Sequence, residues 1–286
     1  TSYCTRATRR GPSEDEPAQE LVARGCAVQI PQTNRRPAIG WRWTGALRIL
    51  YIVYVQHNVR IRAVVFDVDG TLYPASSLYR RCIDLFLAHP GAVIEFAAVR
   101  KQVRSLQQQE EYTPQNREDL HTLQASLMAR GLGMGQSRAR ELMEKLFYLE
   151  LPKRFASIRP YPGARAAIEK IRGSGIRVAA LSDLPPWEKI AALGLSDILE
   201  HSFCAEDAGV LKPHPRAFRD VAEALDMDFP EILYVGNNTA YDIDGPKRLG
   251  MRAARWGRRC SGADFSFSHW DELADWVLAE ECPGGC

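Results

Sequence analysis

Apolar runs alternate with amphipathic stretches in the second half of the chain. Short runs rich in β-branched or aliphatic residues, ended by polar or glycine residues, predict buried strands. Amphipathic stretches between them predict helices over Ala164–Arg172, Trp187–Leu193, Arg216–Leu225 and around Leu273, Trp276 and Val277. The predicted strands are Ala63–Phe66, Ile176–Leu181, a short one at Phe203, Ile232–Val235 and Arg252–Trp256. This alternation predicts an α/β fold, a Rossmann-like parallel sheet with helices on both faces.

The first predicted strand and the second are separated by a long stretch with helical spacing only. Val93, Phe96, Arg100, Val103 and Leu106 share one stripe, and further stripes run from Leu120 to Leu127 and from Leu142 to Leu149. We therefore predict an inserted all-helical cap domain at 75–154, called the helical insert below, within a core made of 59–74 and 155–286. Residues 1–58 show neither the helical spacing of apolar residues nor the alternation typical of strands. They are predicted to be a poorly ordered N-terminal extension of unassigned function.

Polar residues gather where the predicted strands end. Asp67, Asp69, Gly70 and Thr71 follow the first strand, Ser182 and Asp183 the second, and Asn237 and Asp242 the fourth. The carboxyl ends of parallel strands meet at one sheet edge, where ligands bind. Two carboxylates placed together raise each other's pKa, and a divalent cation would offset their repulsion. Any one of these motifs alone is more often a turn, and a lysine such as Lys212 is more often solvated.

Taken together, the motifs resemble the haloacid dehalogenase (HAD) superfamily of hydrolases, and LYP after DGT is typical of a phosphatase-like branch. The matches are DVDGT from Asp67 to Thr71, the strand-ending Ser182, Lys212 in LKPHP, and GNNTAYD from Gly236 to Asp242. The resemblance covers about 62–280 and implies a magnesium-dependent phosphohydrolase that forms an aspartyl-phosphate.

The resemblance also implies a role for each residue. Asp67 would be the nucleophile, ionised at pH 7 without help, and Asp69 the general acid and base; dehalogenating members lack the second Asp. Lys212 would neutralise charge on Asp67 and on the phosphoryl group. The substrate phosphate would be held by Gly70, Thr71, Ser182, Asp183 and Lys212. Magnesium would be held by Asp67, Asp69, Asn237 and Asp242.

Asn237 departs from the family pattern, which usually has Asp at this position. An amide oxygen can ligate magnesium but brings no charge, so metal affinity should be weaker. Two alternatives stay open: a weakly active or inactive binding protein with the same fold, and a phosphomutase. The substrate is expected to be a small phosphorylated metabolite whose identity the sequence does not specify.

Composition limits the remaining classes of function. With 45% hydrophobic residues, the chain has the composition of an ordinary globular protein, and a net charge of only +2 argues against a general nucleic-acid binder. No run of 18 apolar residues predicts a membrane span. Seven cysteines without a CxxC pair predict free thiols and a cytoplasmic location. Oligomeric state is not predicted.

Overall fold

A six-stranded sheet forms the centre of the computed structural model, which describes residues 59–109 and 113–280. All five strand pairs are parallel, in the order β3-β2-β1-β4-β5-β6. The strands are β1 (Ala63–Phe66), β2 (Arg177–Ser182), β3 (His201–Cys204), β4 (Ile232–Gly236), β5 (Arg252–Trp256) and β6 (Phe265–Phe267). The predicted α/β fold with a parallel sheet is confirmed, and β6 is an additional short edge strand.

Strand β1 lies at the point where the strand order reverses. Its Phe66 pairs with Ala180 of β2 on one side and with Val235 of β4 on the other. Because β2 and β4 continue in opposite directions across the sheet, a crevice opens beyond the carboxyl end of β1. All four residues of β1 are buried, which explains its uninterrupted apolar sequence.

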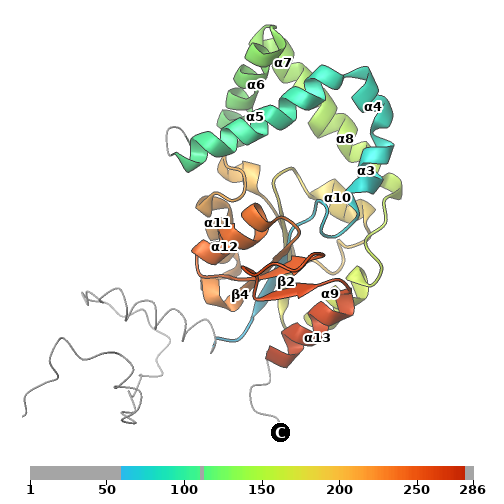
Figure 1. Ribbon diagram of the computed structural model, residues 1–286, viewed down its shortest axis with the longest axis vertical. Coiled ribbons are helices and arrows are strands. Elements are labelled where there is room, and N and C mark those ends of the chain that lie inside the picture. Colours follow the sequence, from blue (N-terminus) through green and yellow to red (C-terminus); the bar gives the residue numbers. More distant parts are fainter. Residues whose placement is uncertain (1–58, 110–112, 281–286) are drawn as a thin grey trace, which may run out of the picture. The chain divides into compact units, whose positions relative to one another are not determined.

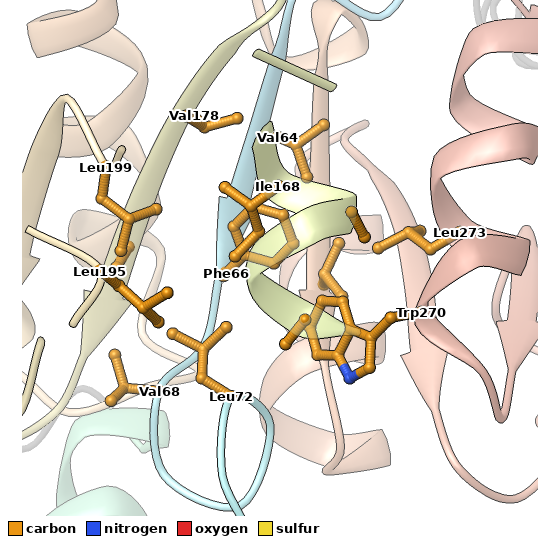
Figure 2. Close-up of a cluster of buried hydrophobic side chains, with 14 of the residues drawn as sticks. Val64, Phe66, Val68, Leu72, Ile168, Val178, Leu195, Leu199, Trp270 and Leu273 are labelled. Atoms are coloured by element: carbon orange, nitrogen blue, oxygen red, sulfur yellow. The ribbon is translucent and has the colours of Figure 1, made fainter. Parts of the chain in front are cut away.

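Two layers of helices cover the sheet. Figure 1 shows α9 and α13 on one side of it and α11 and α12 on the other. In Figure 2, Trp270 and Leu273 of α13 and Ile168 of α9 pack towards Phe66 of β1. The core helices are α9 (Ala164–Gly173), α10 (Trp187–Ala192), α11 (Pro215–Leu225), α12 (Asp244–Arg248) and α13 (Trp270–Glu280). The helices thus bury their apolar stripes against the two faces of the sheet.

Every regular element between β1 and β2 up to Ser157 is helical. The insert contains α3 (Ala75–Arg81), α4 (Ile83–Ala88), α5 (Pro90–Gln108), α6 (Arg117–Leu132), α7 (Gln136–Met143), a π-helical stretch η1 (Glu144–Glu150), α8 (Leu151–Lys153) and a 3-10 turn η2 (Arg154–Ser157). Helix α6 packs on both α5 and α7. The insert has its own buried cluster, which includes Phe96, Met128 and Met143 and also contacts Leu211 of the core.

Local details of the insert differ from the prediction. The single helix predicted from Leu78 to Ala88 is interrupted at Cys82, which leaves the helical conformation at φ −102° and ψ 7°. Pro90 begins α5 rather than only ending the preceding helix, because proline at the first helical position loses no intrahelical hydrogen bond. Leu149 was predicted to lie on an apolar face but is 60% exposed.

The predicted N-terminal extension, residues 1–58, lies outside the described residues. The boundary between the insert and the core at residue 154 stays a prediction. Among the helices of residues 59–109 and 113–280, none combines the length and apolar character that crossing a bilayer requires.

Candidate active site

Asp67 is fixed at the end of β1 by its backbone and by both carboxylate oxygens. Its N–H donates to the carbonyl of Val235 at 2.8 Å, which continues the β1–β4 pairing by one residue. Its Oδ1 accepts from Lys212 Nζ at 2.6 Å, and its Oδ2 accepts from Thr71 Oγ1 at 2.7 Å. The carboxylate is therefore oriented before any substrate arrives.

Lys212 is a buried cation between two carboxylates. Its Nζ donates to Asp67, to Asp242 Oδ1 at 2.8 Å and to the Tyr234 hydroxyl at 2.9 Å. Burial opposes the charged form, but the carboxylates of Asp242 and Asp67 raise the pKa of Lys212 well above its usual range. Lys212 therefore carries its positive charge at neutral pH.

The charge state of Asp67 differs from the expectation of a carboxylate ionised at pH 7 without help. Burial raises the pKa of Asp67 to about 7; Lys212 lowers it, and the carboxylates of Asp242 and Asp69 raise it. The effects of burial and of the neighbouring carboxylates on the pKa of Asp67 thus exceed the opposite effect of the Lys212 ammonium. At neutral pH a substantial fraction of Asp67 is protonated unless further positive charge approaches.

Asp69 is held by three donors. Tyr73 donates its hydroxyl proton at 2.6 Å, Ser182 Oγ donates at 3.0 Å, and Lys189 Nζ donates at 2.6 Å. Burial opposes ionisation, but the Lys189 ammonium and these hydrogen bonds keep the pKa of Asp69 below its usual range. The fully buried Ser182 hydroxyl thus binds Asp69 in this structure, whereas it was predicted to bind the substrate phosphate.

Helix α5 of the insert brings two arginines to the carboxylate of Asp183. Arg104 Nη2 donates to Asp183 Oδ2 at 2.5 Å, and Arg100 Nη2 lies 3.4 Å from the same oxygen. The other oxygen of Asp183 accepts from the Lys212 backbone N–H at 2.8 Å. Both oxygens of the Asp183 carboxylate therefore have partners. Burial alone would raise the pKa of Asp183, but Arg104 and Arg100 hold it below the usual range.

Asn237 lies against the loop that follows Asp67. A Cβ atom on Gly70 would lie 2.3 Å from Asn237 Nδ2, and Gly70 has a φ of +87°, so the loop depends on glycine at this position. The Asn237 amide has no hydrogen-bond partner among residues 59–109 and 113–280. By contrast, both oxygens of Asp242 are occupied, by Lys212 Nζ and by the Asn238 N–H at 3.0 Å.

A cavity of about 410 Å³ brings the predicted residues together. Six of them line it, namely Asp67, Asp69, Asp183, Lys212, Asn237 and Asp242, whereas Gly70, Thr71 and Ser182 lie behind its wall. No cluster of three or more His, Cys, Asp or Glu side chains that could hold a metal occurs in the described part of the chain. Any metal here would need an amide, backbone or substrate oxygen in addition to carboxylates.

The comparison with protein-family models decides the family. The model of the haloacid dehalogenase-like hydrolases matches residues 61–250, which contain every residue that lines the cavity. The chain belongs to this hydrolase family. The predicted superfamily and the prediction of an enzyme are confirmed.

Curated relatives of this HAD-like hydrolase include enzymes named as phosphatases and as dehalogenases. A glyceraldehyde 3-phosphate phosphatase of Methanopyrus kandleri is 28% identical over 76% of this chain and 93% of its own length. One from Pyrococcus abyssi is 38% identical, over 35% of this chain and 43% of its own length. A haloacetate dehalogenase of a Moraxella species is 26% identical over 77% of this chain and 94% of the relative.

Solved structures share the fold. The L-2-haloacid dehalogenase of Xanthobacter autotrophicus superposes with a TM-score of 0.55 at 19% identity, covering 76% of this chain and 98% of that one. A HAD phosphatase of Thermococcus onnurineus gives a TM-score of 0.51 at 23% identity, with the same shares covered. These similarities support the Rossmann-like HAD fold.

Several residues at the site were not selected from the sequence. Tyr73 and Lys189 donate hydrogen bonds to Asp69, and Tyr234 accepts one from Lys212. Arg100 and Arg104 come from the insert and face Asp183. Arg100 gave a usable signal, because an arginine within an apolar helical stripe must find a buried partner. Lys189 and Lys212 are two of only seven lysines in the chain, which is a second signal.

Proposed function

We propose that this HAD-like hydrolase is a magnesium-dependent phosphohydrolase that cleaves small phosphate monoesters through an aspartyl-phosphate on Asp67. The observation that carries the proposal is the second carboxylate, Asp69, which lines the same cavity two residues after the nucleophile. Phosphoryl transfer needs a nucleophile and a separate group that moves protons. Both groups are present, and each is held by its own lysine.

The proposed reaction has two steps. An oxygen of the Asp67 carboxylate forms a bond to phosphorus, the bond from phosphorus to the ester oxygen breaks, and that oxygen takes a proton from Asp69. Water then attacks the phosphorus, Asp69 takes its proton, and phosphate leaves with the Asp67 carboxylate restored. Asp69 is ionised in the free protein, which suits the second step; the bound phosphate dianion raises its pKa for the first.

Lys212 supports both steps without being consumed. It is already hydrogen-bonded to Asp67 at 2.6 Å, so it lies beside the oxygen that forms the bond. Its fixed positive charge stabilises negative charge that builds up on the transferring group, and preorganised charge needs no rearrangement during the reaction. Asp242 and Tyr234 keep the ammonium in place.

The residues present fit a magnesium ion. They offer hard oxygen atoms, and the raised pKa of Asp67 indicates that this carboxylate lacks sufficient positive charge around it. The Asp67 carboxylate, the Asp69 backbone carbonyl and the Asn237 amide would hold the ion. When bound, it would neutralise charge on the phosphate and favour ionised Asp67. Asp242 is better suited to positioning Lys212, because its oxygens are already occupied.

The first substrate to test is glyceraldehyde 3-phosphate. Relatives at 28% and 38% identity carry the name of a phosphatase for this compound. The cavity of about 410 Å³ suits a small metabolite. Asp183, Arg104 and Arg100 line its wall on the side of the insert and would face the leaving group.

The test is release of phosphate from glyceraldehyde 3-phosphate and from p-nitrophenyl phosphate with magnesium. Asp67→Asn should lower turnover at least about a thousandfold, because the covalent step is lost. Rapid-quench mass spectrometry of the parent should find a phosphoryl group on Asp67. The matched control is Asp271→Asn, at an exposed position of helix α13, which should leave turnover within twofold. Turnover of a 2-haloacid without phosphatase activity would contradict the proposal.

A further inference from the structure

A second cavity, of about 540 Å³, is lined by helix α5 of the insert and, in the core, by the Leu211–Pro215 loop and helices α11 and α12. Five basic side chains line it: Arg104, His214, Arg216, Arg219 and Arg248. Among the described residues that line it there is no Asp or Glu. This concentration of one charge is not accounted for by the proposed hydrolysis.

Among the described residues, Arg216, Arg219 and Arg248 form no ion pair with a carboxylate, whereas Arg104 is paired with Asp183. Arg216 Nη1 donates to the backbone carbonyls of Pro114 and Ala208, each at 2.9 Å, which holds the guanidinium in position and leaves its charge unbalanced. In the described part of the chain, Arg219 and Arg248 form no hydrogen bond or ion pair. Asp220, whose charge interacts with Arg216, does not line the cavity.

The fold adds further positive potential. Helix α11 has eleven residues and begins at Pro215, so the positive end of its dipole lies at this wall. Arg219 comes one turn later on the same helix, and Arg248 comes from the end of α12. Separate elements therefore direct donors to one concave surface, which is the arrangement that recognises phosphate groups.

We propose that this basic cavity is a second ligand site, which takes a small, multiply charged phosphate-containing anion. Guanidinium groups bind such oxygens in pairs of hydrogen bonds, and a cavity of this size accepts a small metabolite. Arg104 lines this cavity as well as the catalytic one, so a single guanidinium is shared between the two sites. The inference does not depend on the activity proposed above.

The test uses methylenediphosphonate, a diphosphate analogue whose P–C–P bridge resists hydrolysis, in isothermal titration calorimetry of the metal-free protein at physiological salt. The double variant Arg219→Gln and Arg248→Gln should weaken binding by about tenfold or more, because two charged donors are lost. The matched control, Arg130→Gln and Arg138→Gln, removes the same charge from exposed positions on α6 and α7. Its dissociation constant should stay within twofold of the parent.

Three results would overturn the proposal. The first is equal affinity in all three proteins, which would place the anion elsewhere. The second is equal weakening in both double variants, which would show an effect of overall charge alone. The third is the absence of detectable binding of methylenediphosphonate to the parent protein.

Discussion

At the scale of single residues, the candidate site is a balance of charges between buried carboxylates and basic side chains. Lys212 forms an ion pair with Asp67, and Lys189 forms one with Asp69. Arg104 and Arg100 both pair with Asp183. Asp242 is the extra carboxylate, and it shares Lys212 with Asp67. Burial raises the pKa of all three acids; the shared Lys212 does not overcome it at Asp67, where Asp242 adds negative charge, whereas Lys189 overcomes it at Asp69 and the two arginines overcome it at Asp183.

The raised pKa of Asp67 predicts that magnesium activation depends on pH. Protons and the cation compete for one carboxylate, so the ionised fraction falls about tenfold for each pH unit below the pKa of about 7. The magnesium concentration for half-maximal activity should therefore rise about tenfold from pH 6 to pH 5 and change little above pH 8. A titration series from pH 5 to pH 8.5 measures this. A constant half-maximal concentration would place the ion away from Asp67.

Asn237→Asp should lower the magnesium concentration that gives half-maximal activity. Opposite charges about 4 Å apart at an effective dielectric near 20 interact by roughly 4 kcal/mol. Desolvation of the new carboxylate cancels much of this, which leaves about 1 to 2 kcal/mol, or roughly ten- to thirtyfold in affinity. Saturated turnover should change little.

The neighbouring substitution Asn238→Asp is the matched control for Asn237→Asp. Asn238 is exposed, and its side chain accepts a hydrogen bond from the Tyr241 N–H at 3.1 Å, which an aspartate can also do. Its magnesium titration should overlay that of the parent. Identical curves for both variants would exclude Asn237 as a ligand.

At the scale of elements, the 3-10 turn η3 (Ala205–Ala208) of the core makes a buried polar contact with three elements of the insert, α5, α6 and η1. Glu206 of η3 is fully buried and binds three side chains of the insert: Arg100, His121 at 3.4 Å and Tyr148 at 3.1 Å. Burial opposes its ionisation, but Arg100 and His121 keep its pKa below the usual range. The contact is therefore ionic and shielded from water.

Glu206→Gln should destabilise the protein by about 2 to 4 kcal/mol, because it leaves Arg100 buried with only part of its counter-charge. Urea unfolding of the parent and the variant measures the loss. Asp207→Asn is the matched control, since the adjacent Asp207 side chain is 53% exposed and its ion pair with Arg117 should contribute less than about 1 kcal/mol. A loss below 1 kcal/mol for Glu206→Gln would show that water or a neighbouring donor compensates.

At the scale of the whole molecule, the features that could be predicted are those set by neighbours in sequence. Asp67, Ser182 and Asn237 each follow an apolar strand, and parallel pairing then brings them to one edge. The partners in the finished site depend on contacts far apart in the chain. Arg104 meets Asp183 across 79 positions, and Lys189 meets Asp69 across 120.

The orientation of side chains could not be predicted from the sequence either. Ser182 was placed at the correct strand end, but the direction of its hydroxyl depends on packing, and in this structure it donates to Asp69. Asp242 was placed in the correct motif, but its oxygens bind Lys212 and Asn238. A strand pattern specifies where a residue lies along the sheet edge and leaves open which atoms it meets there.

The insert also contacts backbone atoms of the core. Arg104 Nε donates to the Lys212 carbonyl, and Gln107 both donates to the Gly209 carbonyl and accepts from the Leu211 N–H. Because main-chain groups are the same in every sequence, these contacts survive most side-chain changes in residues 209–212, apart from the space that Gly209 provides. A helix with Arg and Gln three positions apart would therefore meet the same backbone donors and acceptors whatever side chains residues 210–212 carry, so this contact constrains the sequence of the helix more than that of the core loop.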